Sequence, residues 1–502
     1  METGYYLFFG LVVVYILFQY YGMYQSFLFF KKSRVCDRKK QNTSVAAAKD
    51  PKIHILIPVL REQEIIIKNL DIFTNLSGNY EVTYITTEKE KHEKDLALVR
   101  LMARKKRLLA TGSEGVFVEL LVGFFPQNMS RVLFRNRKKE GFWSDLLLQY
   151  RQLPSTADMI DVFIKNSTKN LDFVKHVHYP KTDGLMSHQL NYACDRIAAE
   201  NKSDECFVLI YNADSEVQSN ILDEFRLKIE QGERVIMQSA LFLSNYNSFE
   251  KGFRQSILKS VGLVQSRWTL AHEIPRVRRQ YNQGFLSNFE SAHVVGHGTC
   301  IRLDVLQKVG GYPTVFLNED LPLGYFLALA GERICTLPVL ENAQSPTTLS
   351  SVITQYTTWF FGVAGYYSYY KYAVGHLLLP RRKACLWAWV NTVKALVWLL
   401  TLIVWIILIL APLLLGIGHF TLIAVGLFVL FTTGSNFVVA AFVESNPKIL
   451  GVRSFQVKYT LDMIYSAPVG YLMRSFGPVR GFYQICRSYI TQSGIIKKKT
   501  ER

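Results

Sequence analysis

The sequence predicts an α/β domain with a parallel sheet, attached to α-helical transmembrane segments. Within residues 50–350, short apolar runs alternate with stretches of helical periodicity, as expected for strands alternating with helices. Polar residues follow the end of each apolar run. Because ligands of parallel sheets bind beyond the carboxyl ends of the strands, these polar residues form the candidate site. Long uncharged stretches near both ends of the chain predict the membrane segments.

The α/β domain is expected to begin with a buried strand and a helix. Strands are predicted at 52–60, 80–90, 204–217 and 233–242, and a helix at 62–73. Residues 91–170 include a basic helix and further helical periodicity without a recognisable motif, which predicts a helical insertion.

Three stretches are long and apolar enough to cross a bilayer, which needs about 20 residues. They are residues 5–30, 395–417 and 420–443. Basic clusters follow the first stretch at 31–40, precede the second at 381–383 and end the chain at 497–499. Because basic residues stay on the cytoplasmic side, the sequence predicts a multi-pass protein of the cell membrane with its α/β domain in the cytoplasm.

Two further regions are expected to lie as helices at the membrane surface. Residues 355–384 are rich in tyrosine, and residues 454–490 are amphipathic and contain Pro468 and Pro478. The net charge of +18 is explained by basic residues that flank the membrane. A nucleic-acid partner is disfavoured, because no basic stripe interleaved with aromatics lies elsewhere. Seven cysteines without a C-x-x-C pair predict reduced, structural thiols.

An ordered series of motifs runs through the chain. "IPVLRE", "YITTE" and "IYNADSE" end three strands, and "VVGHGTCIRLDVLQKVGGYP", "LNEDLPLGYFLALAGER" and "QYTTWFFG" follow at 294–313, 317–333 and 355–362. The series resembles the membrane-embedded, inverting glycosyltransferases of family 2, which are related to cellulose, chitin and hyaluronan synthases. The resemblance covers most of 52–362 except 91–170. It implies a GT-A-like, Rossmann-like domain that transfers a hexose from a nucleotide-diphospho-sugar, expected to be UDP-linked, to a growing polysaccharide of a capsule or cell wall.

The resemblance assigns the strand ends to the donor. Asp214 matches the metal-binding acid of the family's D-x-D motif, and its oxygen ligands suit Mg²⁺ or Mn²⁺. Asn212 occupies the first Asp position of that motif and keeps a carbonyl oxygen without the charge. An ordinary turn is the alternative for this Asn-Ala-Asp-Ser segment. The other residues that the resemblance assigns to donor binding are Pro58, Leu60, Glu62, Glu88 and Lys181.

The later motifs are assigned to catalysis and to the acceptor. Asp320 matches the family's general base, which takes the proton from the acceptor hydroxyl, and Glu319 lies beside it. A predicted helix follows Asp320, so a helix N-cap is the structural alternative. The acceptor-side segment of the family corresponds to His297, Gly298 and Thr299, although a lone histidine is often structural.

The segment "QYTTW" resembles the Q-x-x-R-W signature of processive synthases. Gln355 and Trp359 match and are assigned to the acceptor, but Thr358 replaces the arginine that engages the diphosphate in the family. Lys181 is the candidate replacement for that charge. An aromatic-rich interfacial helix is the structural alternative.

Three functions therefore stay open. A polysaccharide synthase that also secretes its product is favoured by Gln355 and Trp359, although three spans form a narrow channel and translocation would need a homo-oligomer. The second function is transfer of a single sugar to a membrane lipid. The third function is a catalytically weak membrane scaffold, which the departures at Asn212, Thr358 and the second strand allow. The family usually ends that strand with a pair of Asp residues, whereas this chain has Thr86, Thr87 and Glu88.

Overall fold

The computed structural model describes residues 2–40, 51–111, 127–450 and 462–491, with the single residues 114, 117, 121 and 125. The chain divides into two compact units, which we describe separately. The sheet unit comprises Pro51–Ser215 and Arg302–Asp304. The helical unit comprises Met1–Asp50, Glu216–Ile301 and Val305–Arg502.

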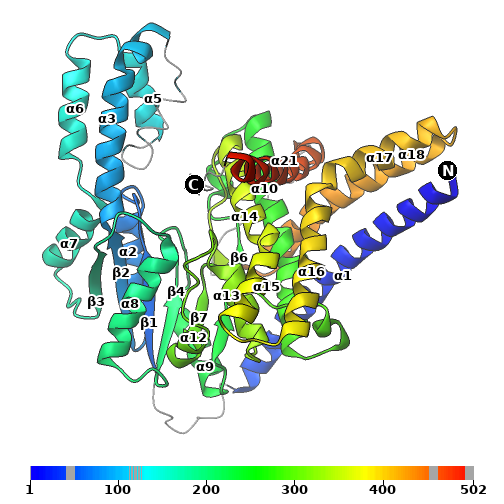
Figure 1. The fold of residues 1–502 in the computed structure, drawn as a ribbon, viewed down its shortest axis with the longest axis horizontal. Helices are drawn as coiled ribbons and strands as arrows, with labels where there is room; N and C mark the ends of the chain where they lie inside the picture. Colours follow the sequence, from blue (N-terminus) through cyan, green and yellow to red (C-terminus); the bar gives the residue numbers. More distant parts are fainter. Residues whose placement is uncertain are drawn as a thin grey trace. The chain divides into compact units, whose positions relative to one another are not determined.

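The sheet unit contains four parallel strands, drawn in blue to green in Figure 1. They are β1 Lys52–Pro58, β2 Tyr80–Thr87, β3 Val174–Tyr179 and β4 Cys206–Ile210, in the spatial order β3-β2-β1-β4. The register pairs Pro58 with Ile85 and Leu56 with Ile210, so the carboxyl ends of neighbouring strands meet at one edge. All eight residues of β2 are buried, as expected for a strand inside a parallel sheet. The α/β class predicted from the sequence is confirmed.

Helices connect the strands of the sheet unit. The helices are α2 Ile66–Thr74, α3 Glu88–Thr111, α5 Gln127–Asn136, α6 Phe142–Gln152, α7 Thr156–Asn166 and α8 Met186–Glu200. The region between β2 and β3, where the sequence predicts an insertion, contains α3, α5, α6 and α7. Helix α3 begins directly after β2, so the polar residues at the end of this strand form the first turn of a helix.

The helical unit also contains short strands. Strand β5 Val235–Met237 pairs antiparallel with β7 Thr299–Arg302 and parallel with β8 Cys335–Thr336. Strand β6 Ala240–Leu241 pairs with β9 Glu341–Asn342. Three short helices accompany these strands: α9 Ile221–Glu230, α12 Leu303–Lys308 and α13 Asp320–Leu329. These strands and α13 position the motifs between residues 294 and 342.

Among the described residues, two helical segments are long and apolar enough to cross a membrane, namely Glu2–Ser33 within α1 (Glu2–Lys40) and His419–Glu444. The second is built from α18 His419–Val429, a π-helical turn η4 Leu430–Gly434 and α19 Ser435–Glu444. Helix α1 lies beside α17 and α18 in Figure 1. The hydroxyl of Tyr5 on α1 donates to the backbone oxygen of Leu408, and the ring of Tyr5 meets that of Phe420 edge-on.

The region of the transmembrane helix predicted at 395–417 contains a bend. Helices α16 Arg381–Leu399 and α17 Thr401–Leu414 meet at 56°, and together they are long and apolar enough to form a third span. The hydroxyl of Thr401 donates to the backbone oxygen of Val397 at the break. Bonds of this kind compete with the helical ladder and often bend a helix.

The C-terminal region forms one long helix, α21 Asp462–Thr491, which continues through both of its prolines. A proline removes the donor for the carbonyl four residues earlier. The carbonyl of Ile464, freed by Pro468, accepts from the hydroxyl of Thr433 at 3.3 Å. The carbonyl freed by Pro478 belongs to Arg474 and accepts from the indole of Trp398 at 3.1 Å. Neighbouring helices therefore replace both missing donors. The predicted residues 454–461 lie outside the described part of the chain.

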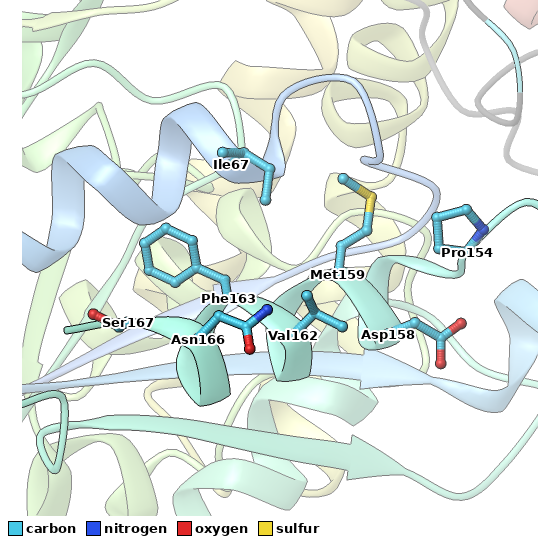
Figure 2. A pocket seen from close by; sticks show the side chains of 8 residues that line it. All are labelled: Ile67, Pro154, Asp158, Met159, Val162, Phe163, Asn166 and Ser167. Carbon is cyan, nitrogen blue, oxygen red and sulfur yellow. The ribbon is translucent and has the colours of Figure 1, made fainter. Parts of the chain in front are cut away.

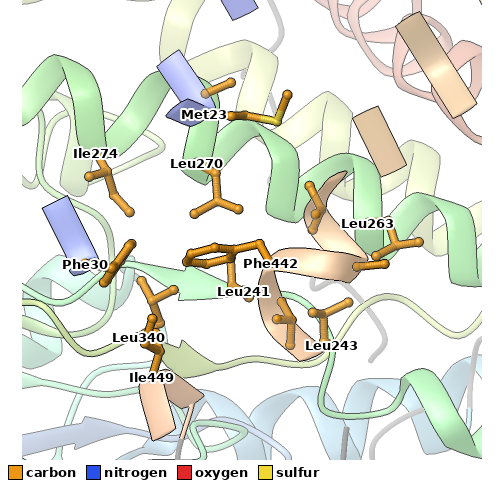
Figure 3. Packing of buried hydrophobic residues seen from close by; sticks show 14 of the residues in the cluster. Met23, Phe30, Leu241, Leu243, Leu263, Leu270, Ile274, Leu340, Phe442 and Ile449 are labelled. Carbon is orange, nitrogen blue, oxygen red and sulfur yellow. The ribbon is translucent and has the colours of Figure 1, made fainter. Parts of the chain in front are cut away.

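A central helix organises the helical unit. Helix α10 Phe253–Trp268 continues through a π-helical turn, η2 Thr269–Glu273, into α11 Ile274–Tyr281. Helix α21 packs against α10 and against α14 Leu349–Ala364, which α15 Tyr366–Gly375 follows. Figure 3 shows how Phe442 from α19 and Phe30 from α1 meet the side chains of the β6–β9 region. This apolar cluster holds the N-terminal helix against the short strands.

Candidate functional site

The turn after β4 carries Asp214 at the shared edge of the sheet. The amide of Asn69, on α2, donates to the backbone oxygens of Asn212 and Ala213 at 3.4 and 2.9 Å. The hydroxyl of Tyr84, on β2, in turn donates to the Asn69 side chain at 2.9 Å. Two neighbouring elements therefore fix the backbone that presents Asp214. The sequence analysis did not single out Asn69, because one polar residue in an amphipathic helix has no distinctive pattern.

The segment from Asn212 to Ser215 is also a closed turn. The backbone N–H of Asn212 donates to the hydroxyl of Ser215 at 3.0 Å, and the N–H of Ser215 donates to the carbonyl of Asn212 at 3.1 Å. Ser215 is buried, whereas Asn212 and Asp214 are half-buried. The structural alternative predicted for this segment, an ordinary turn, is therefore present. The turn is compatible with a site, because it leaves the Asp214 side chain only half-buried.

The loop after β1 is held by a buried acid, Glu90, from the first turn of α3. Its carboxylate accepts from the backbone of Arg61 at 2.9 Å, from the side chain of Gln63 at 2.7 Å and from the backbone of Thr156 at 2.7 Å. The N–H of Glu62 donates to the hydroxyl of Thr156 at 3.0 Å. Glu90 was not expected from the sequence. It fixes the loop that carries Glu62, a predicted donor ligand.

The other predicted donor residues lie at the same edge of the sheet unit. Pro58 ends β1 and the half-buried Leu60 follows it, while Glu88 begins α3. The carbonyl of Lys181 accepts from the hydroxyl of Thr87 at 3.1 Å, and the Lys181 side chain is exposed.

Glu88 ends a chain of polar contacts that crosses β2 and β3. Its carboxylate lies 3.2 Å from Nε2 of His178, whose Nδ1 lies 2.9 Å from the hydroxyl of Thr86. The same hydroxyl lies 2.7 Å from Nε2 of His176, and Nδ1 of His176 lies 2.7 Å from Asp161. The two histidines therefore position Glu88, and the sequence analysis named neither.

The predicted metal ligand Asp214 suits a hard cation that the phosphates of a substrate also coordinate. Among the described residues, no group of three or more His, Cys, Asp or Glu side chains could hold a metal ion by itself. Mg²⁺ is commonly held by one or two carboxylates together with the phosphates of a substrate. The single carboxylate of Asp214, presented on a fixed turn, fits a metal of this kind and does not fit a metal site made by protein ligands alone.

The predicted acid pair stands at the beginning of α13. Glu319 precedes the helix without a side-chain capping bond, and Asp320 is its first residue. Oδ1 of Asp320 accepts from the N–H of Leu321 at 2.7 Å. A methyl group built on Gly296 would stand 3.4 Å from Oε1 of Glu319 and 3.6 Å from Oδ2 of Asp320. The structure therefore brings the "GHG" and "NED" motifs together within the helical unit.

The remaining residues of the "GHG" segment are held by their surroundings. Nδ1 of His297 lies 2.8 Å from the carboxylate of Glu341, which is buried in β9. Gly298 has a φ of 61°, and its backbone oxygen accepts from the N–H of Gln238 at 2.7 Å. The buried Thr299 donates its hydroxyl to the backbone of Val295 at 2.7 Å. The contacts of Gly298 and Thr299 thus stabilise the backbone of this segment, while the ring of His297 is oriented by a buried acid.

The "QYTTW" residues lie on α14. Gln355 is buried and its side-chain oxygen accepts from Gln265 on α10. Trp359 packs against Phe242 and Tyr356, with ring centroids 5.7 and 5.5 Å away. Both matching residues therefore take part in helix packing.

Thr358 is half-buried and lies close to the acid pair. Its hydroxyl donates to the backbone of Thr354 at 3.1 Å, and its backbone oxygen accepts from Asn318 at 3.0 Å. Nearby on α15, burial raises the pKa of Tyr369 well above its ordinary value, and Tyr366, Asp320 and Glu319 add to this effect. Tyr369 is therefore neutral, and it donates to the backbone of Gly362 at 2.8 Å.

A cavity of about 450 Å³ opens between α2 and α7. Figure 2 shows apolar side chains lining it, among them Ile67, Met159, Val162 and Phe163. None of the predicted site residues lines this cavity, so it is not the candidate active site.

Comparisons with known proteins bear on the predicted enzyme class. Residues 207–435 match the model of the family described as "Glycosyl transferase family group 2". No curated protein matches the chain. One similar solved structure is the mannosyltransferase PcManGT from Pyrobaculum calidifontis in complex with GDP-Man and Mn²⁺, at 11% identity and a TM-score of 0.39, covering 93% of this chain and 98% of that chain. Another is S. aureus TarS 1–349, at 11% identity and a TM-score of 0.32, covering 90% and 98%.

The matched segment contains Asp214, the acid pair at 319–320 and the "QYTTW" helix. Residues 207–435 match the model of this glycosyltransferase family, and the enzyme class predicted from the sequence, a family 2 glycosyltransferase, is confirmed.

Proposed function

We propose that the protein is a membrane-bound, inverting glycosyltransferase with a GT-A-like domain, which extends a polysaccharide from a nucleotide-diphospho-sugar that is UDP-linked. One observation carries the proposal. The open backbone of Gly296 lies against the carboxylates of Glu319 and Asp320, so an acceptor that reaches this glycine meets an acid. A glycine lets a sugar approach the backbone closely, and a carboxylate suits the base that glycosyl transfer needs.

The proposed reaction is a single displacement. The carboxylate of Asp320 accepts the proton of the acceptor hydroxyl, whose oxygen forms the new bond to the anomeric carbon. The bond from that carbon to the diphosphate breaks, and the nucleoside diphosphate leaves with the electron pair. Asp214 would hold Mg²⁺ or Mn²⁺ with the phosphates of the donor, and the cation supplies positive charge to the leaving group. Glu88, positioned by His178, and Glu62 would bind the nucleoside part of the donor.

The membrane part of the proposal rests on the apolar helices. Two segments, and a third if the bent pair α16–α17 is one span, have the length and composition of membrane helices. With three spans, the basic clusters at 31–40, 381–383 and 497–499 fall on one side. We therefore place the catalytic domain in the cytoplasm, with the product available for secretion.

Transfer of a single sugar to a membrane lipid is the second candidate. The sequence favours a polymer acceptor because Gln355 and Trp359 match the signature of processive synthases. Both side chains, however, pack between helices. Their presence is thus explained without a polymer acceptor, and the lipid acceptor is therefore kept as the alternative.

One incorporation assay tests these functions. Membranes that contain the full chain are incubated with a panel of labelled UDP- and GDP-sugars, with and without MnCl₂. A high-molecular-weight product supports the synthase, and a chloroform-soluble product supports the lipid transferase. Absence of incorporation from every donor would overturn the proposal in favour of the scaffold.

The role of Asp320 is tested in the same assay. Asp320→Asn should lower the rate by about 10²- to 10⁴-fold, because an amide cannot accept the proton. Asp223→Asn is the matched control, since Asp223 is an exposed acid in the first turn of α9. If the Asp320→Asn variant is folded and retains its turnover, Asp320 is a helix-end residue and not the base.

A further inference from the structure

Arg480 on α21 reaches across to α14. The two helices approach closely because α21 has glycines at the contact: Gly477 lies against Tyr356, and a methyl group on Gly481 would stand 2.8 Å from the ring of Phe360. Between these glycines, Nη1 of Arg480 donates to the hydroxyl of Thr354 at 3.4 Å. The close helix packing therefore fixes the place of this guanidinium on the surface of α14.

Arg480 differs from the other arginines of α21 in its surroundings. The guanidinium of Arg474 packs over the rings of Trp268 and Trp398, with its carbon 5.7 and 5.5 Å from the ring centroids, and Arg487 is exposed. Arg480 is half-buried, and in the part of the chain that the structure describes it forms no ion pair with a carboxylate. A partly desolvated cation without an anionic partner favours the binding of an anion.

Helix α14 connects the position of Arg480 with the acid pair Glu319 and Asp320. Thr354 and Thr358 are neighbours on one half-buried face, one turn or about 6 Å apart along the helix. The carbonyl of Thr358 accepts from Asn318, the residue directly before Glu319 and Asp320. A methyl group on Gly362 would stand 2.6 Å from Nδ2 of Asn318, so this part of α14 lies directly on the acidic loop. The guanidinium of Arg480 and the proposed base Asp320 are thus presented by one connected surface of the helical unit.

The geometry also explains how the protein could bind a diphosphate with a threonine at position 358, where the resemblance puts an arginine. Long side chains on a helix point toward its N-terminus, so an arginine at 358 would bring its guanidinium to the level of Thr354. The guanidinium of Arg480 lies at that level. We propose that Arg480 binds the diphosphate of the nucleotide-sugar and of the leaving nucleoside diphosphate, in place of the arginine that the resemblance puts at position 358. This inference rests on the proposed function.

The test measures nucleotide binding by the full-length protein in detergent micelles with MnCl₂. The probes are UDP and GDP, compared with UMP and GMP, which lack the second phosphate. Arg480→Ala should raise the Kd of the nucleoside diphosphate that the wild type binds by about ten- to a hundredfold, the range for a charge-assisted bond to phosphate. The Kd of the corresponding monophosphate should change by less than about threefold. Adding Thr358→Arg to the alanine variant should restore most of the affinity for the diphosphate.

Arg487→Ala is the matched control on the same helix and should bind as the wild type does. Arg480→Lys, which keeps the charge, should lose less affinity than Arg480→Ala and covers the case in which the alanine variant does not fold. An unchanged Kd of the diphosphate in Arg480→Ala, or an equal loss for mono- and diphosphate, would overturn the inference. If Lys181→Ala loses affinity for the diphosphate and Arg480→Ala does not, Lys181 and not Arg480 is the cation that binds the diphosphate. A wild type that binds neither diphosphate and incorporates no sugar overturns the proposed function, and the inference with it.

Discussion

Gly296 lies against Asp320 with room for one methyl group, which would stand 3.6 Å from Oδ2. This distance is an ordinary van der Waals contact, so Gly296→Ala should fold with an unchanged Tm. If the acceptor approaches the base across this glycine, the added methyl group should lower kcat/KM for the acceptor by about ten- to a hundredfold. Initial rates at varied acceptor and saturating donor, with a melting curve, measure both effects.

The same substitution at Gly298, two residues later, should have a different effect on stability. Its φ is 61°, and a methyl group there would stand 2.5 Å from the backbone oxygen of Gln238. Gly298→Ala should therefore lower the Tm. Gly232→Ala is the control for backbone strain alone, because Gly232 has a φ of 86° and no neighbour within 4 Å. A stable Gly298→Ala variant that has lost only acceptor binding would show that the assignment of a structural role is wrong.

The strand ends of the sheet unit were predictable because their signal is local. A run such as 52–58, bounded by a proline and charged residues, has the length and composition of a buried parallel strand. Parallel strands put their carboxyl ends at one edge, so Glu62, Glu88 and Asp214 could be expected to lie near one another. Asn69 and Glu90 could not be found in this way. Their functions depend on which loops approach them, and a single buried polar residue has no periodicity.

The central helix and the role of Arg480 were missed for a similar reason. Helix α10 is buried on nearly all sides and includes a buried arginine, Arg267, so it has no clean apolar face for a pattern to reveal. Arg480 lies 122 positions after Thr358 in the sequence, and only the packing of α21 on α14 brings it to that helix.

The prolines of α21 give a prediction about stability. Trp398→Phe removes the donor to the carbonyl of Arg474 and leaves that oxygen unpaired where Pro478 already offers no N–H. We expect a loss of about 1–3 kcal/mol in the free energy of unfolding. Pro478→Ala should supply a backbone donor, so Trp398→Phe should cost less in that background. A double-mutant cycle on thermal or denaturant unfolding measures the coupling, and additive effects would contradict the assigned bond.

Glu81 gives a prediction about pH at the other end of the sheet. Burial alone would raise its pKa, but hydrogen bonds from His54, Lys175 and Lys52 lower the pKa to about 2. A carboxyl whose pKa is lower in the folded state stabilises the fold above its unfolded pKa, near 4.5, and loses this contribution as the pH falls toward 2.

The stabilisation by Glu81 should amount to about 2–3 kcal/mol at neutral pH. Glu81→Gln should therefore lower the Tm at pH 7, and the difference from the wild type should shrink steadily between pH 5 and pH 3. Asp71→Asn, an exposed acid on α2, is the control. A difference that stays constant across this range would contradict the ionic origin of the effect.

The contacts that end at Glu88 give a prediction about donor binding. The carboxylates of Asp161 and Glu88 lie within hydrogen-bond distance of ring nitrogens of His176 and His178. The hydroxyl of Thr86 lies between the other two ring nitrogens and links the two histidines. These contacts should hold the Glu88 carboxylate in place for the donor.

His178→Ala removes the contact to Glu88 and should therefore raise the KM for the nucleotide-sugar by about three- to tenfold, since the bond is half-exposed. The kcat should change little, because Glu88 does not take part in the proton transfer. His92→Ala, at an exposed position on α3, should leave the KM unchanged. Donor saturation curves of the three proteins measure both constants. An unchanged KM in His178→Ala would show that the histidines support β3 and do not position Glu88.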